Sequence, residues 1–126
     1  MSDSAYERGM EVRREVLGDA HVDAATGRAT DLTRQFQELI TRYDWGEIWA
    51  RPGLDRRTRS CITIAAMVAL NREHELELHI RAGRRNGLDW DEIKEVLLQS
   101  AIYCGVPAAN AAFAIAQRVM DAEAEG

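Results

Sequence analysis

The sequence is poor in cysteine and lysine and has no long apolar run. Cys61 and Cys104 are its two cysteines. They stand far apart, each in an apolar stretch, so the chain has neither a CxxC pair nor a zinc-type ligand spacing. A disulfide framework and a zinc site therefore have no support, and no motif for another metal or for a cofactor is found.

Membrane-spanning and targeting segments are also not expected. No apolar stretch reaches the length of a membrane span. The first residues, MSDSAYERGMEVRREVLGD, carry acids where a signal peptide has a basic and then an apolar segment. We therefore expect a cytoplasmic protein with no membrane partner.

The sequence has fewer basic than acidic residues. The formal net charge is -5 and the pI is about 5.2, so the surface lacks the basic field that binds phosphate backbones, and nucleic acid is not an expected partner. Lys94 is the only lysine, and arginine grips carboxylates through a planar fork. This bias suits an anionic small substrate, but a GC-rich genome produces it without any function, and both explanations stay open.

Length and patterning predict one all-α domain over residues 1–126. The chain has 126 residues, of which 46% are hydrophobic, enough for one modest core. Apolar residues at helical spacing and turn signals predict about six helices. Residues 1–29 are expected to form an N-terminal arm, with a helix capped within Ser2–Ser4 and ended by Gly18, then a mobile loop over DAHVDAATGRA.

Two helices are predicted after this arm. The first starts near Thr30 and runs through DLTRQFQELITRY toward the Pro52–Gly53 turn. Its apolar residues follow helical spacing: Leu32, Phe36, Leu39, Ile40 and Tyr43. Asp55 is expected to cap the second, which is apolar on nearly all sides and so belongs at the bundle centre.

Local signals place the last three helices. One runs from Arg72 to a left-handed cap at Asn86–Gly87. Asp89 and Glu92 have the spacing of a capping box at the start of the next. Pro107 stands where the first turn of an alanine-rich final helix tolerates it.

Ionisable residues cluster at the start of the helix NREHELELHIRAGRRNG. Arg72, Glu75 and His79 fall within roughly 60° of one another around the helix axis. Two interpretations are open. Glu75 and His79 form an ordinary surface pair, or the groups border the core, lose hydration and gain pKa values suited to proton transfer. The neighbours expected to face the interior are Leu76, Ile80 and Gly83.

Three motifs together resemble the γ-carboxymuconolactone decarboxylases. They are YDWGEIWARPGLDRRTRS, NREHELELHIRAG and EVLLQSAIYCGVPAANAAF, and the likeness covers nearly the whole chain. It implies a six-helix bundle of the alkylhydroperoxidase-D-like superfamily and a homo-oligomer, a trimer or hexamer. In the redox branch of that superfamily a CxxCxxxH motif carries the chemistry.

This sequence departs from the redox motif. Arg72 and Glu75 stand at the two cysteine positions, His79 stands at the histidine position, and His74 stands where that branch often has a second histidine. Without the thiols, peroxidase or disulfide-reductase activity is not expected. Acid-base chemistry is then the plausible use of the site.

The resemblance implies a carboxy-lyase that acts on a dianionic lactone. The reaction removes CO₂ from γ-carboxymuconolactone and gives β-ketoadipate enol-lactone in the protocatechuate branch of aromatic catabolism. Electrons from the leaving carboxylate pass through a double bond onto the lactone oxygen, so no cofactor is expected.

The resemblance also suggests a role for each candidate residue. His79 is the expected general acid, and Glu75 orients its ring or holds its proton. His74 donates to the developing oxyanion or lies at a subunit contact. Arg51 and Arg72 are expected to bind substrate carboxylates, although Arg51 equally fits a surface arginine that caps the preceding helix.

Aromatic residues are the remaining candidates. Trp45 and Tyr103 are expected to wall the departing carboxylate, with ordinary core packing as the alternative, which is favoured for Trp49. Cys104 is expected to serve packing. Other functions also stay open: a decarboxylase or isomerase for another unsaturated lactone, a thiol peroxidase, or a non-catalytic helical interaction module.

Overall fold

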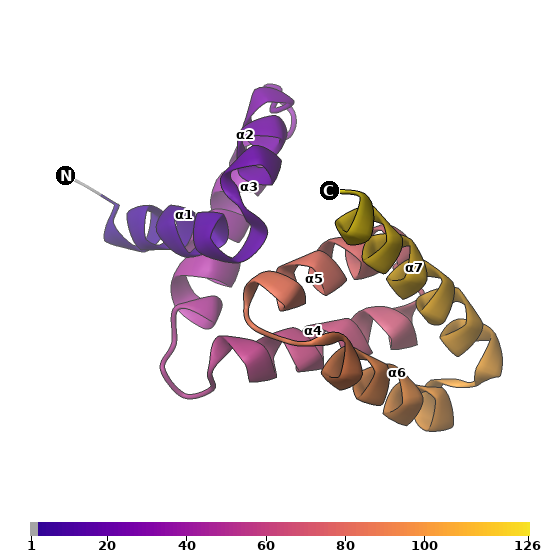
Figure 1. The fold of residues 1–126 in the computed structure, drawn as a ribbon. Helices are drawn as coiled ribbons and strands as arrows, with labels where there is room; N and C mark the ends of the chain where they lie inside the picture. Colours follow the sequence, from indigo (N-terminus) through magenta and orange to yellow (C-terminus); the bar gives the residue numbers. More distant parts are fainter. Residues whose placement is uncertain (1–2) are drawn as a thin grey trace. The chain divides into compact units, whose positions relative to one another are not determined.

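The computed structural model describes residues 3–126, and within that range the chain forms helices and turns without a β-strand. The all-α prediction is thereby confirmed. Seven α-helices and one π-helix follow one another along the chain (Figure 1). They form two compact units, which meet at the boundary between Asp55 and Arg56 in the sequence. The prediction of a single domain over residues 1–126 stays a prediction.

The N-terminal unit contains helices α1 (Ser4–Leu17), α2 (Asp19–Gly27) and α3 (Arg34–Ile40), and the π-helix η1 (Thr41–Trp49). Asp3 caps α1, because its carboxylate accepts the Tyr6 backbone N–H at 3.0 Å. Gly18 ends α1 with a φ of 91°. The predicted cap region and the predicted end of this helix are both confirmed, and Ser2 lies outside the described residues.

Helices α1 and η1 pack with their backbones in close contact. A Cβ atom on Gly9 would lie 1.9 Å from the Thr41 carbonyl oxygen, and one on Gly46 would lie 2.2 Å from the Ala5 carbonyl oxygen. Arg8 Nε donates to the Gly46 carbonyl at 2.9 Å, and Thr41 Oγ1 donates to the Gln37 carbonyl at 2.8 Å. Side chains thus provide donors for backbone carbonyls around the π-helix, which has a wider turn than an α-helix.

Two predictions for this unit are wrong. The stretch after Gly18 was expected to be a mobile loop, but it forms α2, whose Val22 is fully buried. The next helix was expected to start near Thr30 and starts at Arg34, because Thr30 and Thr33 bond to each other through backbone and hydroxyl groups. Its apolar residues at helical spacing are mostly exposed: Leu32, Phe36, Leu39 and Tyr43.

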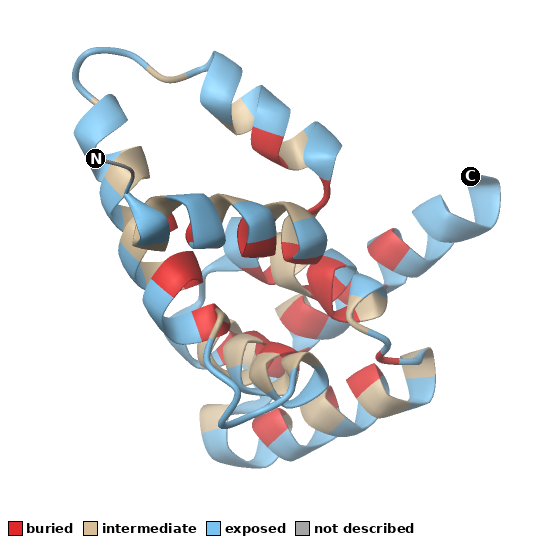
Figure 2. Cartoon of the chain, turned by 90° about the vertical axis from the view of Figure 1, so that its left-hand side faces the viewer, coloured by how far each residue is buried: buried red, intermediate tan, exposed pale blue. Residues whose placement is uncertain are grey.

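The C-terminal unit contains helices α4 (Arg56–Leu70), α5 (Glu73–Arg85), α6 (Trp90–Cys104) and α7 (Val106–Glu125). Figure 2 shows buried residues alternating with exposed ones along the helices. One buried cluster joins all four helices, including Ile64 of α4, Ile80 of α5, Leu97 of α6 and Ile115 of α7. The expected bundle of about six helices therefore becomes seven α-helices and a π-helix over the described residues.

The predicted caps at the end of α5 and the start of α6 are confirmed, as is the predicted place of Pro107, whereas the predicted Asp55 cap of α4 stays a prediction. Gly87 has a φ of 100° after α5, and its N–H donates to the Arg84 carbonyl at 3.1 Å. Asp89 and Glu92 form the complete capping box at the start of α6. Pro107 lies in the first turn of α7.

Helix α4 has a more exposed surface than expected. It packs on α5, α6 and α7, as predicted for a central helix. However, Ile62 is 54% exposed and Leu70 is 61% exposed, so only one side of the helix faces the core. Within residues 3–126, no helix combines the length and the apolar character needed to cross a membrane.

The close contact between α1 and η1 predicts that Gly9→Ala destabilises the N-terminal unit by about 2 kcal/mol or more, despite the better helix propensity of alanine. Gly27→Ala is the matched control, because no atom lies within 4 Å of a Cβ there. Urea unfolding followed by tryptophan fluorescence measures both, since Trp45 and Trp49 lie in the same unit. Equal stability of the two variants would contradict the contact.

Candidate functional site

Helix α5 presents an apolar face to the core of the C-terminal unit. Leu76 is 2% exposed and Ile80 is 0% exposed. Gly83, one turn further along, is buried too. The three residues predicted to face the interior are therefore confirmed in that position, and the polar residues of α5 occupy the rest of its surface.

Helix α5 packs closely against α4 and against the turn that follows α5. A Cβ atom on Gly83 would lie 3.0 Å from Leu88 Cδ1 in that turn and 3.3 Å from Ile64 Cδ1 on α4, which is tighter than ordinary contact. At the end of α5, Asn86 Nδ2 donates to Ser60 Oγ on α4 at 2.8 Å. Ser60 is fully buried. This part-buried bond joins the C-cap residue of α5 to α4, and because a hydrogen bond is specific in direction it restricts the rotation of α5.

The predicted ionisable residues lie at the amino-terminal end of α5. Arg72 is the N-cap residue, with φ -95° and ψ 78°, and the next turn carries His74 and Glu75. His79 is half-buried, whereas Arg72, His74 and Glu75 are exposed. The expected partial burial therefore holds for the imidazole and not for the carboxylate or the guanidinium.

Two other candidates lie near the end of α6. Tyr103 is 82% exposed, and its predicted place beside the departing carboxylate stays a prediction. Cys104 is partly buried and packs against the core cluster, as expected for a packing residue.

Trp45 and Arg51 belong to the N-terminal unit. Trp45 is 4% exposed and Trp49 is 7% exposed. Their ring centroids lie 5.1 Å apart, so the two rings pack against each other, and the predicted substrate contact of Trp45 stays a prediction. Arg51 is exposed and follows η1, where its backbone N–H donates to the Ile48 carbonyl at 3.1 Å.

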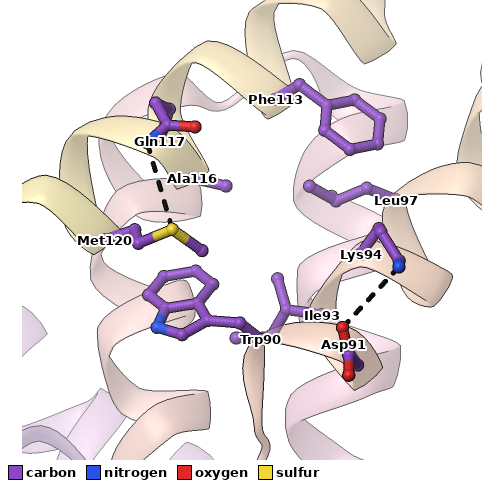
Figure 3. Close-up of a pocket in the computed structure, with 9 residues that line it drawn as sticks. All are labelled: Trp90, Asp91, Ile93, Lys94, Leu97, Phe113, Ala116, Gln117 and Met120. Carbon is purple, nitrogen blue, oxygen red and sulfur yellow. Dashed lines mark hydrogen bonds and ion pairs between the residues drawn. The ribbon is translucent and has the colours of Figure 1, made fainter.

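Two cavities of the C-terminal unit are lined by residues outside the predicted site. One, of about 220 Å³, lies between α6 and α7, with Trp90, Leu97, Phe113 and Met120 among its walls (Figure 3). The other, of about 390 Å³, is lined by residues of α4 and α6. Neither cavity is lined by the ionisable residues predicted on α5. Across residues 3–126, no group of three or more His, Cys, Asp and Glu side chains is arranged to hold a metal ion.

Sequence reasoning missed the residues that position α5. Ser60 is a small polar residue in a largely apolar helix, and its pairing with Asn86 joins positions 26 residues apart. The one local signal was the Asn86–Gly87 pair, which predicted the cap but not the partner of the amide. A polar residue inside an apolar helix is a reason to look for such a partner.

Comparison with known proteins gives a consistent result. Residues 34–118 match the model of the carboxymuconolactone decarboxylase family. The 4-carboxymuconolactone decarboxylase of Acinetobacter baylyi is 49% identical over 114 residues, which are 90% of this chain and 85% of that protein. A protein of the same name from Pseudomonas putida is 52% identical over 42 residues, or 33% of this chain and 88% of that sequence.

A relative with a different named substrate is also similar over most of the chain. The nitrosuccinic acid decarboxylase of Metarhizium robertsii is 40% identical over 116 residues, which are 92% of this chain and 81% of that protein. These relatives share decarboxylation in their names and differ in the acid they act on.

The Ser60–Asn86 contact predicts that Ser60→Ala lowers the free energy of unfolding by about 1 kcal/mol, because the Asn86 amide loses its acceptor. Ser100→Ala is the matched control. Ser100 is 5% exposed, and its hydroxyl bonds to Val96 O in its own helix at 2.8 Å, so alanine is expected to be nearly neutral there. Thermal unfolding followed by circular dichroism measures both. A smaller loss in Ser60→Ala than in Ser100→Ala would show that the contact does not hold α5.

Proposed function

The chain belongs to the carboxymuconolactone decarboxylase family, and from this we propose that it converts 4-carboxymuconolactone to β-ketoadipate enol-lactone and CO₂. The observation that carries the proposal is the match to the Acinetobacter decarboxylase over 90% of the chain. The ionisable residues of α5 support it, because they provide proton donors and a cation on one helix.

The substrate can supply its own electron sink. As CO₂ leaves, the electron pair of the broken C–C bond moves through the double bond onto the lactone carbonyl oxygen. The resulting furan-like oxyanion then takes a proton at the carbon next to the carbonyl. Under this proposal the protein orients a dianion, stabilises the oxyanion and delivers one proton, and no cofactor is required.

His79 is the proposed proton donor. Its ring is half-buried, and its neighbour Ile80 is fully buried. An imidazole titrates near neutral pH and can therefore give a proton to a carbanion and take one back from solvent. Glu75, one turn earlier, is proposed to orient the ring. His74 is proposed to donate to the oxyanion, with a subunit contact as its alternative role.

Arg72 is the proposed carboxylate ligand of the C-terminal unit. It is exposed at the start of α5, where backbone N–H groups and the positive end of the helix dipole also favour an anion. Arg51 stays a proposed carboxylate ligand, and Trp45 and Tyr103 stay proposed substrate contacts. These roles are tested by substitution.

Nitrosuccinic acid is a second candidate substrate. The relative named for it is 40% identical over 92% of this chain. By its name this acid carries two carboxyl groups and a nitro group, and a nitro group accepts an electron pair as a lactone carbonyl does. An assay of both acids with one preparation separates the candidates.

We also propose that copies of this chain associate with one another in the cytoplasm. Near the end of α6, Ile102 is 80% exposed and Tyr103 is 82% exposed, and Val106 at the start of α7 is 68% exposed. Exposed apolar side chains this close together are typical of protein contacts. A trimer or hexamer is the proposed state.

His79→Gln is predicted to lower kcat by about 100-fold or more, since a positioned general acid typically contributes that much. His21→Gln is the matched control, because His21 lies on α2 of the N-terminal unit, and it should retain wild-type activity. The measurement is the ultraviolet loss of 4-carboxymuconolactone generated in situ, with folding checked by circular dichroism. No loss with the wild type would end the substrate assignment, whereas equal rates for all three proteins would end only the role of His79.

Arg72→Lys and Arg51→Lys are each predicted to raise KM about tenfold, with a smaller effect on kcat, because lysine keeps the charge but loses the planar fork. Arg28→Lys, at an exposed arginine after α2, is the matched control. Initial rates over a range of substrate concentrations separate KM from kcat. An unchanged KM in either variant would remove that arginine from the substrate contacts.

A further inference from the structure

Arg13 is a buried cation whose hydrogen-bond partners are neutral. It lies on α1 and is 6% exposed. Its Nη1 donates to Thr41 Oγ1 and its Nη2 to Gln37 Oε1, both at 3.1 Å. A guanidinium has five N–H donors, and among the described residues the Nε–H of Arg13 has no partner. The side chain therefore keeps capacity for a further acceptor.

The charge of Arg13 is only partly compensated. Burial lowers the pKa of its guanidinium, and the nearby Asp44 carboxylate acts in the opposite direction. Burial also raises the pKa of Asp44, so this carboxylate is itself poorly solvated. A buried cation held by neutral acceptors is costly unless an anion lies near it.

Arg13 lines a cavity of about 280 Å³ within the N-terminal unit. Arg34 and Glu38 of α3 also line it, and Arg34 is already paired with Asp31 at 2.9 Å. The same cavity has an apolar wall. Tyr6 and Met10 of α1 contribute to that wall, together with Ala29 after α2.

We propose that this cavity binds a small monocarboxylate with a compact apolar body, its carboxylate on Arg13 and its body against Tyr6, Met10 and Ala29. A carboxylate matches the planar fork of arginine. Glu38 opposes a more highly charged anion such as phosphate. The site is separate from the α5 residues, and the proposal does not depend on the decarboxylase activity.

The test is isothermal titration of the full-length protein with benzoate, in a buffer free of phosphate and other carboxylates. Benzamide is the matched neutral probe, because it has nearly the same shape. Saturable benzoate binding is expected, with benzamide about tenfold weaker or more, since a hydrogen bond to a charged group contributes roughly that factor.

Two variants locate the site. Ala29→Phe places a large side chain in the cavity while Arg13 is kept, and Arg13→Gln removes the charge. Each is expected to weaken benzoate binding about tenfold or more, while His79→Gln binds as the wild type does. Arg13 also holds Thr41, so Arg13→Gln is informative only if circular dichroism shows it folded. Ala29→Phe keeps the test decisive in either case.

Several results would overturn the proposal. They are the absence of saturable binding, equal affinity for benzoate and benzamide, and inorganic phosphate that competes as tightly as benzoate. Unchanged binding in a folded Ala29→Phe variant would also overturn it. Loss of binding in His79→Gln would place benzoate on α5 instead.

Discussion

The contact between α5 and α4 at Gly83 is the constraint on which the candidate site depends. A side chain there would press on Ile64 of α4 and on Leu88 in the turn after α5, so the small size of glycine helps α5 to lie close to α4. The Ser60–Asn86 hydrogen bond then restricts the rotation of α5. Together these contacts determine which residues of α5 face the core and which can meet a substrate. The site therefore owes its geometry to residues that take no part in the proposed chemistry.

Much of the C-terminal unit was predictable because its signals are local. The left-handed cap at Gly87, the Asp89–Glu92 capping box and Pro107 each act within about one turn of helix. The apolar face of α5 could also be predicted from the sequence, since Leu76 and Ile80 are one turn apart, and both are buried. Such features follow from short-range hydrogen bonding and helical periodicity, which the sequence states directly.

The N-terminal unit was harder to predict because distant residues determine it. Arg8 reaches the Gly46 carbonyl, 38 residues away, and the π-helix exists in contact with α1. Adjacent arginines also have opposite environments. Arg13 is buried with neutral partners, whereas Arg14 pairs with Asp19 and Asp23. Successive residues of a helix point in different directions, so Arg13 and Arg14 lie on different faces of α1. Nothing in the local sequence shows which of these faces will pack against the rest of the unit.

The exposure of Arg72, His74 and Glu75 limits what α5 can do by itself. Loss of CO₂ from a carboxylate is favoured where solvation of the ground state is poor, and an exposed turn of helix does not provide that condition. His79, half-buried beside Ile80, comes nearest to it. Under the proposed function, the C-terminal unit therefore supplies the proposed proton donor and a cation but does not shield them from water. The proposed reaction requires a second surface over these residues, and the proposed self-association is one source of it.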